Sequence, residues 1–287
     1  MHQTALVVGA GTMGSGIAEV AARAGLEVRL YDVTRERGQA GREALSRSLE
    51  RAVTKARLER SQADQILARV TVVDELQASG CAVVFEAVSE NISLKKQLFG
   101  QLSEQAPEAL LATNTSSLSV TEIAAAAAAP DRVVGMHFFN PAPVMALLEI
   151  VTAVQTSEAS LDQARQLAER FGKTPIVVRD VAGFATSRLG IILGMEAIRM
   201  VEMGVASAAD IDKAMELGYR HPMGPLKLTD LVGLDVRLAI AEHLTRELGP
   251  QFSPPPLLRT MVRAGHLGKK SGQGFYRWDG NQAHPLS

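Results

Sequence analysis

The chain begins with a short apolar run that leads directly into a glycine-rich turn. Residues 5–8 are strand-like, and residues 17–24 place their apolar side chains on one face of a helix. Between them lie three glycines in the spacing GxGxxG, namely Gly9, Gly11 and Gly14. The glycine spacing alone is common, but a strand before it and a helix after it are typical of a dinucleotide-binding unit. This feature predicts a parallel α/β sheet at the N-terminus.

Each residue of the turn has a distinct physical task. Gly9 permits the tight turn, Gly11 lets backbone amides reach a pyrophosphate, and Gly14 allows the helix to pack closely on the strand. The N-terminus of the helix offers N–H groups and a partial positive charge to the phosphates. We therefore predict that Thr12 and Met13, which lie between these glycines, contact the cofactor together with them.

An acidic residue follows the next predicted strand. Asp32 lies 18 residues after Gly14, close to the spacing of about 20 that dinucleotide-binding proteins show. Its carboxylate can accept hydrogen bonds from both ribose hydroxyls and would repel a 2′-phosphate, which favours NAD as the cofactor. Arg35 and Arg37 lie nearby and leave NADP open as an alternative.

Strands alternate with helices over the first part of the chain and then give way to helices alone. This alternation predicts a mostly parallel sheet with helices on both faces, a Rossmann-type domain over residues 1–181. An all-α domain is predicted over residues 182–287, with one helix spanning 224–248 and a further strand only near 274–276. Within the first domain, residues 121–129 are predicted to form a helix that stops at Pro130.

Composition excludes several classes of partner. The formal net charge is −1 and the isoelectric point is near 6.6, so nothing favours nucleic acid or a membrane surface. Cys81 is the only cysteine, no secretion signal is visible, and we expect a cytoplasmic protein. The histidines show no metal-ligand spacing with one another or with the cysteine, so we predict no metal site.

One histidine stands at the start of a proline-rich loop between two apolar runs. His137 lies six residues before Pro143, and Glu149 lies six residues after it. If the chain reverses at this proline as a hairpin, the imidazole and the carboxylate lie on neighbouring strands within contact distance. A buried carboxylate fixes the tautomer of a histidine and stabilises its protonated form, which suits a general base.

The glycine turn and the histidine loop together resemble the L-3-hydroxyacyl-CoA dehydrogenases, in particular the bacterial 3-hydroxybutyryl-CoA dehydrogenases. The resemblance spans nearly the whole chain. It is carried by residues 9–17, 85–91, 113–118, 137–141, 195–198, 221–225, 230–235 and 270–276. The segments HFFNP at 137–141 and HPMGP at 221–225 are far more specific than the glycine pattern.

The resemblance implies a catalytic group. The base that takes the proton of the 3-hydroxyl, while C3 passes a hydride to the nicotinamide, corresponds to His137, and the carboxylate that orients it corresponds to Glu149. A serine and an asparagine near the substrate correspond to Ser116 and Asn140, and the asparagine is also near the nicotinamide. The expected reaction interconverts (S)-3-hydroxyacyl-CoA, with a short chain such as 3-hydroxybutyryl-CoA, and 3-oxoacyl-CoA.

Further cofactor and partner contacts are implied by the same resemblance. Glu90, Lys95 and Lys270 correspond to residues that contact NAD. The C-terminal helices are expected to form a homodimer interface and to close over the substrate. One position departs from the family pattern, because Ser187 stands where many members carry an asparagine whose amide helps to hold the substrate hydroxyl.

A basic stripe on the second predicted helix is a candidate for the coenzyme. Arg47, Arg51 and Lys55 recur every four residues, so they share one face of that helix. The phosphates of coenzyme A could bind there, and Ser48 and Lys55 align with positions that touch the coenzyme in relatives. A solvated helix face, with several glutamates nearby, is the alternative.

Other assignments also have structural alternatives. Ser116 and Glu90 could cap helices, Asn140 could serve its turn, and Lys95 could be a solvated charge. At the level of function, the alternatives are an NAD-dependent sugar-acid dehydrogenase of the L-gulonate type and a non-enzymatic cofactor-binding module. The intact glycine turn, Asp32 and the His137–Glu149 pair argue against the non-enzymatic alternative.

Overall fold

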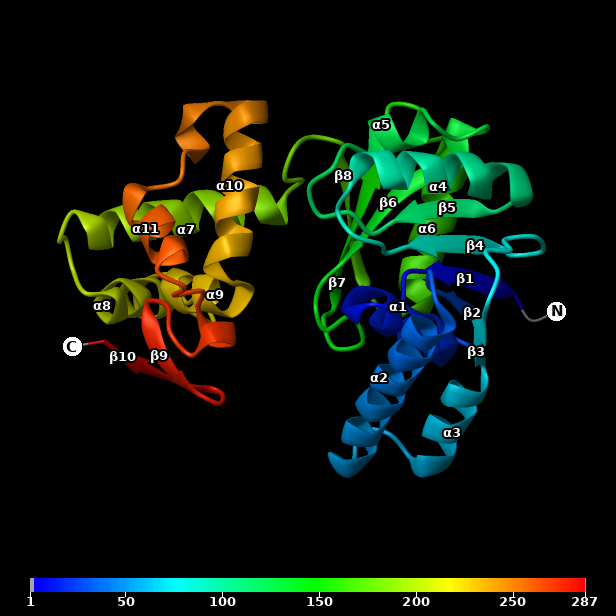
Figure 1. Ribbon diagram of the computed structural model, residues 1–287, viewed down its shortest axis with the longest axis horizontal. Coiled ribbons are helices and arrows are strands. Elements are labelled where there is room, and N and C mark those ends of the chain that lie inside the picture. Colours follow the sequence, from blue (N-terminus) through cyan, green and yellow to red (C-terminus); the bar gives the residue numbers. More distant parts are fainter. Residues whose placement is uncertain (1–2, 287) are drawn as a thin grey trace. The chain divides into compact units, whose positions relative to one another are not determined.

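The computed structural model describes residues 3–286 and divides the chain into two compact units, one ending at Val181 and the other beginning at Ala182 (Figure 1). The first unit alternates strands and helices, as the sequence predicts. Its elements are β1 (Thr4–Val8), α1 (Thr12–Arg23), β2 (Glu27–Tyr31), α2 (Arg35–Thr54), α3 (Arg60–Ala68), β3 (Val70–Val73), β4 (Val83–Glu86), α4 (Ile92–Gln105), β5 (Leu110–Thr113), α5 (Val120–Ala124), β6 (Val133–Phe138), β7 (Leu147–Thr152), α6 (Glu158–Arg170) and β8 (Thr174–Arg179).

One eight-stranded sheet forms the centre of this unit, in the order β3-β2-β1-β4-β5-β6-β7-β8. The strands from β3 to β6 are parallel, β7 runs antiparallel to β6, and β8 is parallel to β7. The predicted mostly parallel Rossmann-type sheet is therefore confirmed. Sequence analysis missed α6, although a parallel connection from β7 to β8 requires a crossover of this kind.

Alternate strand residues bury two separate faces of the sheet. Val7, Leu30, Phe85 and Met136 join one apolar core together with the inner faces of α1 and α6. His137 follows Met136 in β6, so its side chain emerges on the opposite face. Strand β6 is buried throughout, which keeps water away from the histidine backbone.

The polyalanine prediction is wrong in its extent. Helix α5 ends at Ala124, and the residues that follow form short turns instead of a helix that continues to Pro130. The N–H of Ala128 donates to Ser103 Oγ at 2.8 Å, so a tertiary contact replaces a helical hydrogen bond. Alanine propensity is too weak to outweigh such contacts over a few residues.

The second unit is helical, with a small sheet at its end. Its elements are α7 (Thr186–Glu202), α8 (Ala208–Lys213) with a π-helical extension over Ala214–Gly218, α9 (Pro225–Val232), α10 (Leu234–Leu248), α11 (Pro256–Arg263), β9 (Tyr276–Asp279) and β10 (Gln282–Pro285). The single helix predicted over 224–248 is wrong, because Gly233 has φ +104 and separates α9 from α10. The expected strand near residue 276 belongs to the antiparallel pair β9–β10, which the sequence did not reveal.

No helix within residues 3–286 combines the length and apolarity needed to cross a membrane.

A buried carboxylate attaches the terminal β9–β10 sheet to the helices. Asp230 accepts hydrogen bonds from the backbone N–H groups of Phe275 and Tyr276 and from the indole N–H of Trp278, each at 2.9 Å. Its exposed fraction is 1%, so no solvent can replace these partners. Asp230 therefore acts as a polar anchor between α9 and β9.

We expect Asp230→Asn to lower the free energy of unfolding by about 1–3 kcal/mol, because the amide nitrogen leaves at least one buried donor without an acceptor. Urea unfolding followed through the fluorescence of Trp278, the only tryptophan of the chain, measures this loss directly. The matched control is Asp279→Asn on the exposed side of β9, which should stay within about 0.5 kcal/mol of the parent. Equal losses in both variants would contradict the anchor role.

Candidate functional site

A cavity of about 380 Å³ lies where the strand order of the sheet reverses, between β1 and its two neighbours. Its walls include the ends of β1, β2 and β4 together with side chains of α4. In open α/β sheets, ligands bind at this reversal, outside the carboxyl ends of the strands. The glycine turn and the acidic residue predicted from sequence therefore line one cavity.

The glycines of the turn leave space for backbone contacts. Gly9 has φ +97, and a Cβ there would lie 2.7 Å from the carbonyl oxygen of Ala87. A Cβ on Gly14 would lie 1.7 Å from the carbonyl oxygen of Gly9, so α1 could not approach β1 with any other residue. Around Gly11 nothing lies within 4 Å of a hypothetical Cβ, and no side chain caps α1 there. The first amides of α1 can therefore meet a phosphate.

Asp32 is held in place at the end of β2. Its Oδ2 accepts the N–H of Ala10 at 2.8 Å, and its Oδ1 accepts the N–H of Val33 at 2.8 Å. The Nε of Arg37 lies 3.2 Å from Oδ1, whereas Arg35 pairs with Asp74, the residue that follows β3. The carboxylate thus stands at the place where a ribose hydroxyl of a dinucleotide would bind.

His137 and Glu149 face each other across neighbouring antiparallel strands. They are direct partners in the register of β6 and β7, as the symmetric spacing about Pro143 predicts. His137 Nδ1 lies 2.7 Å from Glu149 Oε2, and the exposed fractions are 7% for the histidine and 0% for the glutamate. The ring of Phe139 lies against the imidazole, with 4.5 Å between ring centres. Such a carboxylate fixes Nδ1 as the protonated nitrogen, so proton exchange with a ligand falls to Nε2.

Ser116, which follows β5, is held by the carboxylate of Glu90, which lies between β4 and α4. Glu90 Oε1 accepts the N–H of Ser116 at 2.7 Å, its hydroxyl at 3.0 Å and the hydroxyl of Thr115 at 2.9 Å. The second oxygen of Glu90 lies 3.5 Å from Lys95 Nζ. Lys95 is 1% exposed and donates to Glu86 at 2.7 Å. A chain of charged contacts therefore runs from the buried Lys95 of α4 through the exposed Glu90 to Ser116.

These contacts decide between the structural alternatives. Ser119, not Ser116, caps α5, and Asn91, not Glu90, caps α4. Lys95 is 1% exposed, which excludes the alternative of a solvated charge. Sequence analysis missed Glu86, whose carboxylate is 0% exposed at the end of β4. Its signal was a single acidic residue within an otherwise apolar run, which requires a cationic partner elsewhere.

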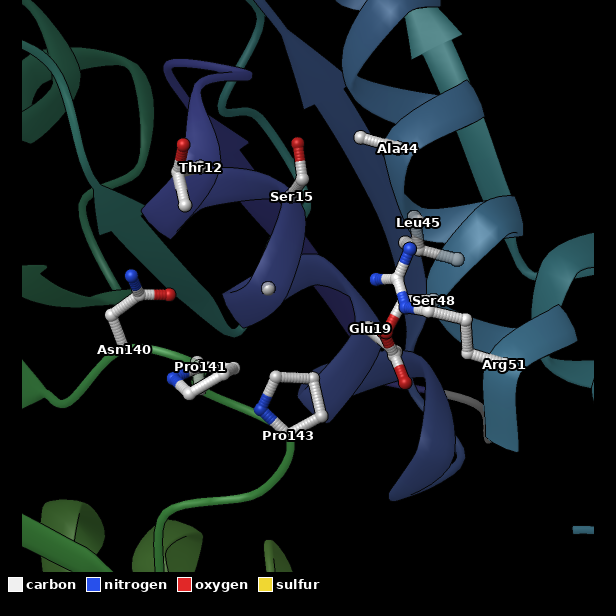
Figure 2. A pocket seen from close by; sticks show the side chains of 12 residues that line it. Thr12, Ser15, Glu19, Ala44, Leu45, Ser48, Arg51, Asn140, Pro141 and Pro143 are labelled. Atoms are coloured by element: carbon white, nitrogen blue, oxygen red, sulfur yellow. The ribbon is translucent and has the colours of Figure 1, made fainter. Parts of the chain in front are cut away.

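A groove made of two adjoining cavities, about 240 and 480 Å³, lies between α1, α2 and the loop from β6 to β7. Figure 2 shows the smaller of the two. Asn140, Pro141 and Pro143 form the wall on the loop side, and Ser48 and Arg51 of α2 face them across the groove. Residues that line both cavities are Glu19, Ser48, Arg51, Pro141 and Pro143.

Two of the three residues of the basic stripe line this groove. Arg51 and Lys55 line it together with Arg23 and Arg57, so four cations gather around the larger cavity. Among the described residues, the lining does not include Arg47, whose guanidinium lies 3.9 Å from a glutamate on the same helix. Arg51 and Lys55 are exposed and also line the groove, so the alternatives of a solvated helix face and a coenzyme site both stay open for them. The charges around the groove suit a ligand with several negative charges.

The remaining candidate residues belong to the second unit. Ser187 lies in the first turn of α7. Lys270 lies in a short 3₁₀ turn, and its Nζ is 2.5 Å from an oxygen of Asp235. Cys81 is buried, and burial raises the pKa of its thiol, as expected for an unreactive apolar residue.

Two family models match the chain. The model described as 3-hydroxyacyl-CoA dehydrogenase, NAD binding domain, covers residues 4–181, and the model of the C-terminal domain of the same enzymes covers residues 183–278. The match identifies the first unit as an NAD-binding domain, in agreement with the glycine turn and Asp32.

Curated relatives and a solved structure agree with this match. The chain is 45% identical to a probable 3-hydroxybutyryl-CoA dehydrogenase of Bacillus subtilis, over 96% of each chain. It is also 45% identical to the 3-hydroxybutyryl-CoA dehydrogenase of Mycobacterium tuberculosis, over 95% of this chain and 97% of the relative. The crystal structure of the (S)-3-hydroxybutyryl-CoA dehydrogenase of Ralstonia eutropha superposes with a TM-score of 0.92, at 39% identity over 97% of this chain and 100% of that one.

Proposed function

The chain belongs to the 3-hydroxyacyl-CoA dehydrogenase family, and from this membership we propose that it interconverts (S)-3-hydroxyacyl-CoA and 3-oxoacyl-CoA with NAD. A short acyl chain, as in 3-hydroxybutyryl-CoA, is the proposed substrate, because it is named in the relatives of highest identity given above. The observation that carries the chemistry is the 2.7 Å contact between His137 and Glu149 in a buried hairpin.

The proposed proton transfer follows from that contact. In the oxidation, His137 takes the proton of the 3-hydroxyl at Nε2, while Glu149 holds the proton on Nδ1 and stabilises the resulting imidazolium. In the reduction the same imidazolium returns the proton to the 3-oxo oxygen. Ser116, held by Glu90, and Asn140, at the edge of the groove, are proposed to bind the substrate oxygens.

The first unit fits NAD. When bound, NAD supplies the acceptor for the hydride that leaves C3 of the substrate. The glycine turn provides a cradle that a Cβ would fill, and Asp32 provides the acceptor for ribose hydroxyls. We propose that Thr12 and Met13 contact the pyrophosphate at the N-terminus of α1, and that Lys270 is a further cofactor contact, as the family resemblance implies. Lys95 is proposed to act on the cofactor side through Glu90, because its ammonium is buried.

The basic groove supports coenzyme A as the carrier of the acyl group. Coenzyme A carries several phosphate charges, and Arg23, Arg51, Lys55 and Arg57 surround the larger cavity. Ser48 lies between the two cavities and supplies a hydroxyl to the same wall. A free sugar acid has one carboxylate and leaves most of these cations unused, so the groove favours an acyl-CoA over L-gulonate.

We expect Arg51→Ala and Lys55→Ala each to raise the KM for the acyl-CoA by about 5- to 20-fold, because each removes one charge-assisted contact to phosphate. The KM for NADH should stay unchanged, since the NAD cavity is lined by other residues. Arg47→Ala, on the same helix but outside the groove, is the matched control. A KM increase in Arg47→Ala as large as in Lys55→Ala would show a general charge effect and contradict a coenzyme site.

The function is tested by steady-state turnover on 3-oxoacyl-CoA thioesters of increasing length, with NADH and NADPH in parallel. We expect turnover with short chains and a preference for NADH, because Asp32 would repel a 2′-phosphate. Oxidation of L-gulonate is measured under the same conditions. Turnover of L-gulonate without turnover of any acyl-CoA would replace the proposal with a sugar-acid dehydrogenase.

We also propose a homodimer formed through the second unit. Exposed apolar side chains on α7, α9 and α10 support this assignment, and they are Leu189, Leu228, Leu231, Val232 and Val236. Light scattering at several protein concentrations tests it, and a monomer at all of them would reject it. A cytoplasmic location remains a prediction from the single cysteine.

A further inference from the structure

The loop between β6 and β7 is held by the buried ammonium group of one lysine. Lys173, the residue before β8, donates to the carbonyl oxygen of Ala142 at 2.6 Å and to that of Met145 at 2.7 Å. Thr174 adds a backbone hydrogen bond to the carbonyl oxygen of Ala146 at 2.8 Å. The segment from 142 to 146 is thus attached at three points to the start of β8.

The loop carbonyls also stabilise the charge of Lys173, which is largely shielded from water. The lysine is only 8% exposed, and burial lowers its pKa, an effect that Arg23 increases and Glu19 opposes. Within the described residues it makes no ion pair, and its ammonium donates to the two loop carbonyls. A buried ammonium is tolerated only where acceptors replace water. The loop therefore has one favourable position relative to this charge.

Helix α1 limits the loop from the opposite side. A Cβ on Gly16 would lie 3.1 Å from Ala142 Cβ and 3.5 Å from Pro143 Cδ. Glycine at this position lets the loop pack against the helix backbone, and a methyl group would push it away by a few tenths of an ångström. The loop is therefore fixed between Gly16 and Lys173.

We propose that Lys173 is a positioning residue of the reaction, which holds the 140–145 segment against Gly16 and so sets both Asn140 and the wall of the acyl-CoA groove. The inference rests on the proposed function, because it concerns the same site. Asn140, Pro141 and Pro143 all lie on this segment and all line the groove. A shift of about 1 Å at a substrate-positioning group can cost roughly 10²-fold in rate.

The first test compares Lys173→Met with Lys173→Arg. Methionine matches the aliphatic stem of lysine but lacks its ammonium, so it leaves both carbonyls without a donor. We expect kcat/KM for the acyl-CoA to fall about 10- to 100-fold. Arginine keeps the charge and the donors and should restore part of the loss. The KM for NADH should stay within about twofold, because the loop does not line the NAD cavity. Lys96→Met, at an exposed ion pair with Glu122, is the control for removing a lysine from the same unit.

The second test moves the loop from the other side. Gly16→Ala improves helix propensity, so the protein should not lose stability through the helix itself. We nevertheless expect kcat/KM for the acyl-CoA to fall by about tenfold, since the new methyl group displaces Ala142.

A third test does not depend on turnover. Hydrogen exchange measured by mass spectrometry on the cofactor-free protein should show faster exchange in the 140–147 peptide of Lys173→Met, and wild-type exchange elsewhere.

These experiments distinguish a failure of the proposed role of Lys173 from a failure of the proposed enzymatic function. Unchanged kinetics for the acyl-CoA in a folded Lys173→Met variant would overturn the proposed role of Lys173. If that variant does not fold, unchanged kinetics for the acyl-CoA in Gly16→Ala would overturn it. If the wild-type protein turns over no acyl-CoA, the proposed function fails, whereas the exchange experiment still decides whether Lys173 holds the loop.

Discussion

His137→Gln is expected to bind NADH as the wild-type protein does and to lose turnover by about 10²- to 10⁴-fold, the range that a positioned general base contributes. Glutamine keeps a polar side chain of similar reach in β6 but cannot take or return a proton near neutral pH. His137 is 7% exposed, so bulk water cannot readily replace the base. Steady-state kinetics with 3-oxobutyryl-CoA, together with a fluorescence titration of NADH, measure both quantities.

The two measurements also exclude a folding defect. The NAD cavity is formed by β1, β2, β4 and α4, and His137 does not line it. A variant that retains NADH affinity therefore retains the fold of the first unit. If kcat stayed within about threefold of the parent, another residue would have to be the base.

Glu149→Gln is expected to lower kcat by about 10²-fold or more, with little change in the KM for either substrate. The amide preserves volume in a position that is 0% exposed, but it removes the negative charge that stabilises the imidazolium of His137. It can also turn its NH₂ group toward Nδ1 and favour the wrong tautomer. The pair His137→Gln and Glu149→Gln should be strongly non-additive, since the carboxylate acts only through the histidine.

Glu104→Gln is the matched control, because Glu104 is an exposed acid on α4. It should show wild-type kinetics. A double variant in which the two losses simply multiply would contradict the model of one coupled proton-transfer unit. Glu149→Asp offers a further comparison, since the charge remains but the contact to Nδ1 becomes longer.

Much of the site was visible in the sequence because it depends on local geometry. The glycine turn, Asp32 and the strand–helix alternation are short-range patterns, and each follows from backbone rules within a few tens of residues. The pairing of His137 with Glu149 was also predictable, because both positions are equally far from the turn at Pro143 in an antiparallel hairpin.

Other elements were not predictable in this way. The polyalanine segment has the composition of a helix, yet Ser103 of α4 takes the N–H of Ala128. The break at Gly233 required a left-handed conformation that one glycine in a helical pattern does not announce. In the polyalanine segment a partner far away in sequence outweighed local propensity.

What the sequence by itself determined is the class of fold, the cofactor-binding turn and the pairing of His137 with Glu149, since these depend on residues whose spacing sets their relative position. Only the tertiary structure decided which charges meet. It placed the buried Lys95 within reach of Glu86 and Glu90, and it brought Lys173 into contact with the loop that carries Asn140. It also placed Arg51 and Lys55 along the groove. The physical reason is that a charge is stabilised by whatever lies within a few ångströms of it, and chain connectivity does not encode that distance for residues on different elements.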